Sequence, residues 1–299
     1  MSIFVQAISK NYDAQKALDQ VTFQVKSGEI VGFLGPNGAG KSTMMKILTG
    51  YISADSGSAE ICGINVSDAG ENIRTKIGYL PEHNPLYLDL YVKECLQFIS
   101  GIHKIKKPSE RIAEIIQLTG LTKEAHKKIG ALSKGYRQRV GLAQAMIHDP
   151  EVLILDEPTT GLDPNQIIEI RQLIKHIGST KTVLFSTHIM QEVQAICNRA
   201  IIVNKGKIVA DSTIENLNKN ANQTIIEVEF DAVFQQAWFS SIAGFEKVKS
   251  VGINKWEVQS KQDIRSDIFK LAVEKGISVL TIQLKEKNLE QIFQNLTQS

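Results

Sequence analysis

Short runs of β-branched and aromatic residues open the chain, and turn-forming residues separate them. The runs are IFVQAI (3–8), VTFQV (21–25) and IVGFLG (30–35), with KSGE before the last. Runs of this kind are typical of β-strands. Over residues 86–148 the apolar residues instead recur every three or four positions, which predicts a helical insert.

Unbroken apolar runs resume after the insert. EVLILDEP (151–158) and KTVLFSTH (181–188) are typical of buried parallel strands, and NQIIEIRQLIKHIG (165–178) predicts a helix between them. AIIVNKGKIVADS (200–212) alternates around an Asn-Lys-Gly turn and predicts a hairpin. Together these elements predict an α/β domain with a β-rich start over residues 1–218.

The tail has its own order of elements. IENLNKNANQ (214–223) is polar enough to be a domain boundary. Beyond it the pattern is strand, helix, two strands, helix, strand and a final helix, which predicts a small α+β, ferredoxin-like domain over residues 223–299. The corresponding segments are TIIEVEF, DAVFQQAWFSSIA, KVKSVG, KWEVQS, QDIRSDIFKLAVEKG, SVLTIQL and NLEQIFQNL. Trp238 and Trp256 are expected to pack in its core.

Composition narrows the class of protein. With 299 residues, 42% hydrophobic and 22% charged, the chain is expected to form two globular domains. The net charge of +2 gives no electrostatic reason to bind nucleic acid, and none is expected as a partner. Cys62, Cys95 and Cys197 stand far apart, which favours a reducing compartment over structural zinc. No run reaches the roughly 18 apolar residues that cross a bilayer, so we expect a cytoplasmic chain.

The segment FLGPNGAGKSTMMKIL (33–48) carries the clearest chemistry. Gly35, Gly40, Lys41 and Ser42 match the phosphate-loop spacing G-x-x-x-x-G-K-[ST]. Glycines let backbone amides approach phosphates, and the helix that follows points its positive end at them. Lysine can reach the outer phosphates and the serine hydroxyl can bind Mg²⁺.

Two acidic residues follow a buried strand downstream. Asp156 and Glu157 end the apolar run VLIL, at the sheet edge where α/β proteins bind ligands. Asp156 is suited to hold a metal ion through water. Because a phosphate loop lies upstream, a solvated turn is the weaker interpretation of this pair.

The order of these motifs resembles that of the ATP-binding subunits of ABC transporters, over nearly everything to about residue 215. The resemblance implies a P-loop NTPase fold with a β-rich subdomain, a RecA-like core and a helical insert. It also implies a Mg²⁺-dependent ATPase whose hydrolysis is coupled to transport. The residues that it assigns to ATP binding in the loop are Gly35, Asn37, Gly38, Ala39, Gly40, Lys41, Ser42 and Thr43.

Further positions match the family by motif. Tyr12 stands where the family stacks a ring on adenine, although a lone Tyr also occurs in turns. LSKGYRQR (132–139) resembles the signature segment, which implies that Ser133 and Gly135 bind the outer phosphate of ATP held by the other subunit. In GLDP, Asp163 is a predicted helix N-cap in a loop that crosses the family's dimer interface.

His188, at the end of FSTH, corresponds to the family's phosphate-sensing histidine, although a lone His is often structural. Two departures from the family pattern stand out. Lys134 and Tyr136 replace the usual Gly and Gln of the signature, and Glu82 replaces the glutamine expected after the IGY strand. Glu82 could bring an oxygen to Mg²⁺ or to the attacking water, or be an exposed loop acid.

The resemblance implies a mechanism. Ser42, Asp156 and Glu82 would bind Mg²⁺, Glu157 would orient or deprotonate the attacking water, and His188 would steady the γ-phosphate. Each site is complete only when a second subunit, identical or paralogous, contributes Ser133. ATP would then hold a dimer at the inner face of the cell membrane, coupled to integral-membrane permease subunits. The branch suggested is one of export or gliding-motility subunits.

Three alternatives remain. A GTPase needs Asn-Lys-x-Asp, and NKGK (204–207) and NKWE (254–257) lack the final acid. A soluble ATPase of the same superfamily acting on ribosomes or DNA normally has two cassettes or a long coiled coil, and this chain has one phosphate loop and no sustained heptads. A scaffold that binds ATP without cleaving it is expected to lack Glu157 or His188.

Overall fold

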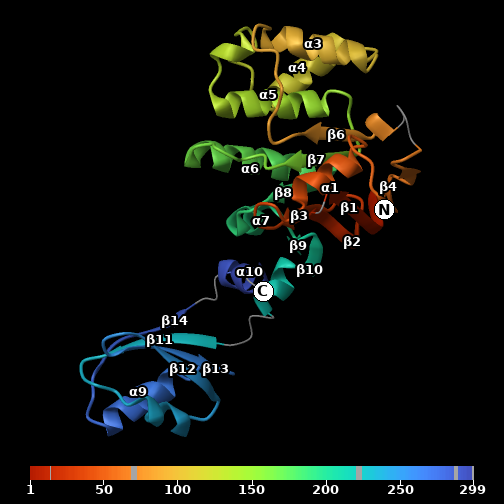
Figure 1. Cartoon of the computed structure of the whole chain (residues 1–299). Coiled ribbons are helices and arrows are strands. Elements are labelled where there is room, and N and C mark those ends of the chain that lie inside the picture. The colour runs from red at the N-terminus through yellow and green to blue at the C-terminus, as the bar shows by residue number, and fades with distance from the viewer. Residues whose placement is uncertain (14, 69–72, 220–223, 286–288, 298–299) are drawn as a thin grey trace. The chain divides into compact units, whose positions relative to one another are not determined.

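The computed structural model describes residues 1–13, 15–68, 73–219, 224–285 and 289–297. The chain divides into two compact units, Met1–Ile214 with Leu296–Ser299 and Glu215–Asn295 (Figure 1). Each unit has its own hydrophobic core. That residues 1–218 and 223–299 are separately folding domains stays a prediction.

The first unit begins with a four-stranded antiparallel sheet of order β2-β1-β4-β5. Its strands are β1 (Ile3–Tyr12), β2 (Gln15–Val25), β4 (Ser56–Ile61) and β5 (Ile64–Asn65). Alternating buried residues of these strands join the core that also underlies the central sheet. This sheet is the β-rich start predicted from the sequence.

The central sheet has six strands in the order β10-β9-β3-β8-β7-β6, all parallel except β10. Every residue of β3, β7 and β8 is buried, as expected for parallel strands covered on both faces. The strands are β3 (Ile30–Leu34), β6 (Ile77–Leu80), β7 (Val152–Asp156), β8 (Thr182–Thr187), β9 (Arg199–Asn204) and β10 (Lys207–Thr213). The helices of this part are α1 (Lys41–Leu48), α6 (Pro164–Gly178) and α7 (Met190–Ile196). The helix α8 (Ile214–Lys219) starts at the boundary, and all but its first residue belong to the second unit.

The predicted helical insert forms between β6 and β7. It contains α3 (Val92–Ile102), α4 (Pro108–Leu118), a 3-10 turn η1 (Ile129–Ala131) and α5 (Lys134–Met146). Its helices stack beyond the β6 edge of the central sheet (Figure 1). Arg139 of α5 ties the insert to α6, because its guanidinium donates to Glu169 at 2.6 Å.

The second unit is a four-stranded antiparallel sheet of order β12-β13-β11-β14. The first strand of this unit along the chain, β11, lies between the third, β13, and the fourth, β14. This strand order is the ferredoxin-like arrangement predicted for the tail. The elements are β11 (Thr224–Phe230), η2 (Gln236–Ser241), β12 (Phe245–Gly252), β13 (Lys255–Ser260), α9 (Arg265–Glu274) and β14 (Val279–Lys285), followed by α10 (Leu289–Thr297).

One predicted tail helix is wrong. The segment 231–243 forms only the six-residue 3-10 helix η2. The Ser240 and Ser241 hydroxyls donate to carbonyls three residues back, and Phe234 stacks on Phe230 with centroids 4.1 Å apart. Local side-chain hydrogen bonds compete with the α-helical ladder, and the buried aromatic rings decide the path of the chain instead.

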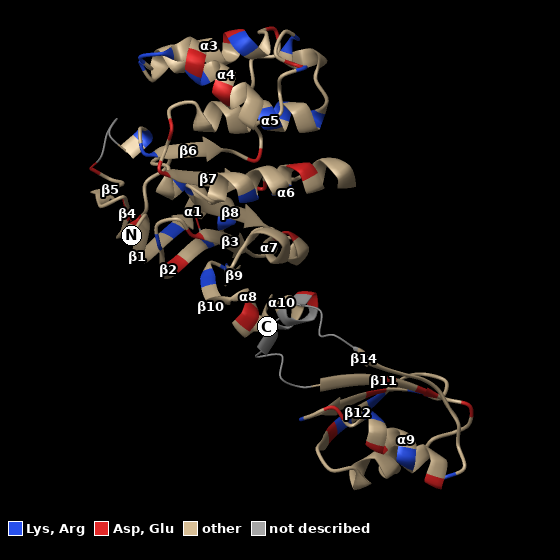
Figure 2. Cartoon of the chain, turned by 180° about the vertical axis from the view of Figure 1, so that it is seen from behind, with Lys and Arg blue, Asp and Glu red and all other residues tan. Residues whose placement is uncertain are grey.

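The sequence predicts a polar domain boundary over residues 214–223. The first part of this segment is the helix α8, and residues 220–223 lie outside the described residues. Lys and Arg are interspersed with Asp and Glu over each unit (Figure 2). Among the residues that the structure describes, no helix is both long enough and apolar enough to cross a bilayer.

Candidate nucleotide site

The topology of the central sheet assembles the site. The phosphate loop follows β3, Glu82 follows β6, Asp156 ends β7, and His188 follows β8. These four strands are neighbours and parallel, in the order β3-β8-β7-β6. Their carboxyl ends meet at one edge, which brings residues far apart in sequence together.

A pocket of about 450 Å³ lies at this edge. Most of the predicted nucleotide residues line it, together with three that the sequence did not single out: Gln15, Ala17 and Thr160. The predicted residues that line it are Tyr12, Asn37, Gly38, Gly40, Lys41, Ser42, Thr43, Glu82, Glu157 and His188. Thr160 follows the Asp-Glu pair, and no spacing rule distinguishes Gln15 or Ala17.

The phosphate loop depends on its glycines. Gly38 and Gly40 have φ of 79° and 103°, which side-chain-bearing residues rarely adopt. A Cβ at Gly40 would lie 2.4 Å from the Ala17 carbonyl oxygen, so the loop also needs the empty space. Gly40 is the N-cap of α1, and no side-chain oxygen caps the first turn of this helix. The first amides of α1 are therefore suited to an anion.

Gly35 and Ala39 do not line the pocket but shape its loop. A Cβ at Gly35 would lie 2.5 Å from the Val203 carbonyl oxygen. Ala39 is buried, and its carbonyl accepts from the Gly206 amide at 3.1 Å. Their position supports a structural contribution to the loop rather than direct contact with a ligand.

Lys41 is buried within the loop that it belongs to. Its ammonium donates to the carbonyls of Gly35 at 2.8 Å and Pro36 at 3.3 Å. It also lies 3.2 Å from Oε1 of Glu157. Only 6% of the Lys41 side chain is exposed, so this cation is held by fixed groups rather than by solvent.

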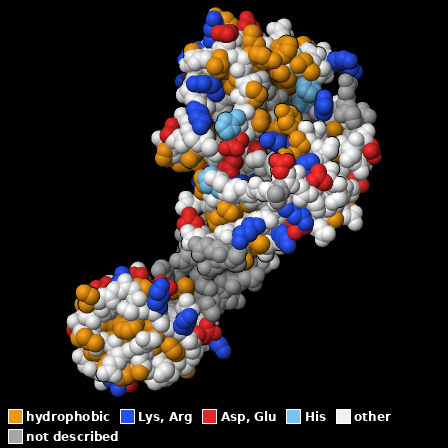
Figure 3. All heavy atoms as spheres, in the orientation of Figure 1, with side chains coloured by type: hydrophobic (Ala, Val, Ile, Leu, Met, Phe, Trp, Pro, Cys, Tyr) orange, Lys and Arg blue, Asp and Glu red, His pale blue; other side chains and the backbone are white. Residues whose placement is uncertain are grey.

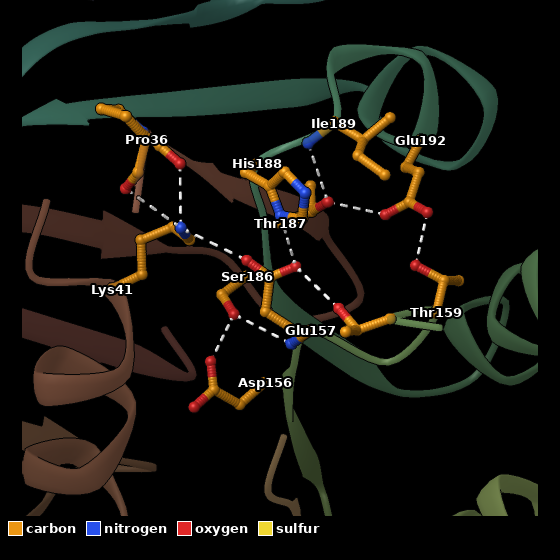
Figure 4. A network of polar contacts seen from close by, with 12 residues as sticks. Pro36, Lys41, Asp156, Glu157, Thr159, Ser186, Thr187, His188, Ile189 and Glu192 are labelled. Carbon is orange, nitrogen blue, oxygen red and sulfur yellow. Dashed lines mark hydrogen bonds and ion pairs between the residues drawn. The ribbon is translucent and has the colours of Figure 1, made fainter. Parts of the chain in front are cut away.

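Glu157 is the centre of the polar network in Figure 4. Its Oε1 faces Lys41, while Oε2 lies 2.9 Å from His188 Nδ1 and accepts from Thr160 Oγ1 at 3.3 Å. Its backbone has φ of 49°, in the left-handed region. Ser186 stabilises that turn, because its hydroxyl accepts the Glu157 amide hydrogen at 3.0 Å.

Asp156 reaches the pocket through Ser42. Its Oδ1 accepts from Ser42 Oγ at 3.2 Å and from Ser186 Oγ at 2.5 Å. Burial raises the pKa of the Asp156 carboxyl, the two hydroxyl donors oppose that change, and the nearby Glu82 charge adds to it. The pair of Ser42 and Asp156 therefore presents hard oxygen donors beside the phosphate loop.

Tyr12 lies at the pocket with nearly half of its side chain exposed. The Lys10 ammonium is 5.9 Å from the centroid of the Tyr12 ring. An exposed ring at the mouth of a nucleotide-sized pocket favours stacking on a base over a role in the core.

The signature residues lie elsewhere. Ser133 caps α5, accepting from the Tyr136 amide at 3.4 Å, and Asp163 caps α6, accepting from the Gln166 amide at 2.9 Å. A Cβ at Gly135 would lie 2.6 Å from Gln166 Cδ, so the two helix starts are adjacent. Ser133, Gly135 and Asp163 do not line the phosphate-loop pocket of their own chain.

The family model described as ABC transporter matches residues 18–160. The chain is also 37% identical to the bacitracin transport ATP-binding protein BcrA of Bacillus licheniformis, over 97% of this chain and 95% of the relative. The chain belongs to the ATP-binding proteins of ABC transporters. The family and the fold class predicted from the sequence are thereby confirmed.

Two further members extend the comparison. The chain is 35% identical to the Nod factor export ATP-binding protein I of Burkholderia pseudomallei, over 69% of each. Among solved structures it is similar to the ABC cassette MJ0796, whose dimeric post-hydrolysis state holds ADP and Pi, with a TM-score of 0.64 and 27% identity. That match covers 71% of this chain and 98% of the cassette.

Proposed function

We propose that this ABC protein hydrolyses ATP as one of two subunits that close around two nucleotides and drive an exporter. The observation that carries the proposal is the position of Glu157, a buried carboxylate held between Lys41 and His188 at the phosphate-loop pocket. A carboxylate so placed can orient or deprotonate a water molecule beside the terminal phosphate.

The oxygen donors present suit Mg²⁺. Ser42 and Asp156 are already in contact, and Glu82 lines the same pocket. Within the described residues, no group of three or more His, Cys, Asp or Glu is arranged to hold a metal ion. This agrees with Mg²⁺, which usually takes one or two protein oxygens and completes its shell with phosphates and water. When bound, Mg²⁺ would neutralise charge on the β- and γ-phosphates.

The chain's own groups divide the remaining work. The amides at the start of α1 and the Lys41 ammonium hold the phosphates. Glu157 positions the attacking water and takes its proton, and His188, which contacts Glu157, steadies the γ-phosphate. Tyr12 stacks on the adenine.

Dimerisation completes the site in this proposal. Ser133 and Gly135 stand at the start of α5, away from their own pocket, where a hydroxyl and the first amides of the helix can meet the phosphate bound by a second copy. Asp163 shapes the neighbouring loop. The dimeric state of the similar cassette MJ0796 supports this arrangement.

Membrane-spanning subunits are the proposed partners, with the chain at the inner face of the membrane. An exposed apolar cluster on the insert supports a protein contact there; it consists of Tyr87, Leu88, Tyr91, Phe98 and Ile102. Tyr87 and Phe98 meet edge to face with centroids 6.1 Å apart. Hydrophobic side chains gather over the insert in Figure 3. Contiguous exposed apolar residues typically mark interaction sites.

Export is favoured because one relative is an export protein and another a transport protein. A gliding-motility complex stays a prediction that no comparison tests. Co-purification separates these from the alternative, a soluble ATPase: membranes should retain the chain, whereas recovery on ribosomes or DNA would support the alternative.

The decisive experiment is Glu157→Gln. We expect ATP turnover to fall by at least ~10²-fold, the usual contribution of a general base. The variant should keep ATP binding and be held as a dimer by Mg²⁺ and ATP. Glu151→Gln is the matched control, because Glu151 precedes the same strand, pairs with Lys76 and lies outside the pocket.

With the membrane subunits present, we would measure ATP turnover, ATP binding and the mass of the complex in solution. Wild-type turnover in Glu157→Gln contradicts the catalytic assignment. A monomer at saturating ATP in every condition contradicts the dimer.

A further inference from the structure

The two edges of the tail sheet differ in chemistry. The strand order β12-β13-β11-β14 leaves β12 and β14 at the edges. Edge β12 carries Glu246, Lys247 and Lys249, and its pairing with β13 is irregular near both ends. Charged residues and irregularities are the features that stop an edge strand from pairing with another chain.

Edge β14 lacks that protection over most of its length. Its sequence is VLTIQLK, so its single charge is the last residue. Among the described strands it pairs only with β11, and the pairing is regular from Thr281 to Lys285, with one irregularity at Leu280. Leu280 and Leu284 are 58% and 41% exposed. The strand therefore presents an open row of backbone groups with uncovered apolar side chains.

We propose that β14 is an interface on which β14 of a second copy pairs antiparallel, joining the two tail sheets into one. A two-fold axis at Ile282 places Ile282 opposite itself and Leu280 opposite Leu284 of the second copy. Thr281 then faces Gln283 of the second copy, and Lys285 faces Val279. Apolar residues meet apolar residues, polar meets polar, and no two like charges oppose each other.

The same operation on the other edge is unfavourable. A two-fold axis at Val248 in the middle of β12 places Lys247 opposite Lys249 of the second copy, twice over. Like charges directly opposite each other destabilise a strand pair. In this central register β12 therefore pairs with itself less favourably than β14 does.

One strand pair is a small interface, below the roughly 1,200 Å² of a stable complex, so we expect weak association of free chains. Tethering changes this. If ATP holds two copies together, as the proposed function requires, each tail meets the other at an effective concentration of about millimolar order. The β14 pair would then form readily and stabilise the ATP-held dimer in return.

The test uses full-length protein with paired cysteines. In Thr281→Cys/Gln283→Cys, each new thiol faces its counterpart across the proposed axis, within the reach of a disulfide. Lys247→Cys/Lys249→Cys is the matched control on edge β12. Unmodified protein gives the baseline from Cys62, Cys95 and Cys197, of which the last two are buried.

After mild oxidation, the amount of covalent dimer is measured by mass. One arm contains no nucleotide and a high protein concentration. The other contains Mg²⁺ and ATP, and its protein also carries Glu157→Gln. We expect at least about tenfold more covalent dimer from the β14 pair than from the β12 pair in the ATP arm. Adding Leu284→Lys should abolish the excess, whereas Ile253→Lys, in the 93% exposed turn of the other hairpin, should not.

Equal yields from the two edges in both arms overturn the proposal. When the membrane subunits are added to the ATP arm, cross-linking of β14 only to one of them overturns it as well. The arms also separate this inference from the proposed function. If ATP holds no dimer, the nucleotide-free arm still reports on β14 alone, and an excess of β14 product there supports the pairing.

Discussion

Glu192 shows how a buried charge outside the pocket can set the geometry of the site. It is fully buried, and the hydroxyls of Thr159 and Thr187 donate to its two carboxylate oxygens (Figure 4). Thr187 also accepts from the Ile189 amide at 3.0 Å. The carboxylate therefore links the loop after Glu157 to the strand end that carries His188, and its partners satisfy it without solvent.

Glu192→Ala should lower the free energy of unfolding by about 2–4 kcal/mol, because it leaves buried hydroxyls without their acceptor. ATP turnover should fall as well, since both flanking loops lose a common anchor. Glu192→Gln keeps one carbonyl acceptor and should lose less than Glu192→Ala. Urea unfolding measures the loss of stability in both variants, and an ATPase assay measures turnover. Equal stability of the alanine variant and the wild type would contradict the argument.

His148 gives the chain a predictable response to acid. Its Nε2 lies 2.9 Å from the Ile77 carbonyl oxygen, and its ring stacks on His103 with centroids 4.0 Å apart. Burial, and then the neighbouring His103, lower the pKa of His148 to about 4. The unfolded chain, with an ordinary pKa of 6.5, therefore binds more protons than the folded chain between these two values.

Stability should accordingly fall as the pH drops from 6.5 toward 4. At about pH 5 the difference in protonation of His148 corresponds to about 2 kcal/mol. Glutamine does not titrate. Between pH 7 and pH 5 the free energy of unfolding should therefore fall less in His148→Gln than in the wild type, by up to about 2 kcal/mol. Urea unfolding at the two pH values measures it. An unchanged pH dependence would mean that His148 titrates alike in both states.

At the scale of elements, Gly40 lies where the phosphate loop meets α1, and the packing there leaves no space for a side chain. Gly28 and Gly40 both have positive φ, but a Cβ at Gly28 meets nothing within 4 Å, whereas one at Gly40 meets the Ala17 carbonyl oxygen. Gly28→Ala should cost about 1 kcal/mol from backbone strain alone. Gly40→Ala should lower the free energy of unfolding by more than that and should also abolish ATP binding. Urea unfolding measures the first effect and nucleotide titration the second. Equal effects of the two substitutions would exclude the steric argument.

Most of this element-level picture was predictable from the sequence. Apolar runs gave the strands, and the motif order placed the loop, Asp156, Glu157 and His188 at one sheet edge. Contacts that only the folded chain creates have no sequence pattern and could not be predicted. Examples are Gln15 and Ala17 at the pocket, and the Ser186 hydroxyl that donates to Asp156. The segment that became η2 has helical spacing, but the aromatic stacking that overrides it depends on the fold.

At the scale of the whole molecule, the two cores share no residues. Such units are expected to unfold in separate steps, and a ligand stabilises only the step in which its site is lost. ATP at 100 times its dissociation constant should raise the stability of the first unit by about 2.7 kcal/mol and leave the second unchanged. Calorimetry with and without ATP checks this. A single transition that shifts as a whole would show that the two units unfold together.

The contact between Lys41 and Glu157 has a consequence for the idle protein. Each is the other's counterion at 3.2 Å, and both side chains are almost fully buried. An arriving triphosphate carries more negative charge than one carboxylate and competes for the same ammonium. If Glu157 is the general base, as proposed, nucleotide binding would release its carboxylate from Lys41 only when a phosphate is present. Without nucleotide, the same ammonium would hold the base away from water.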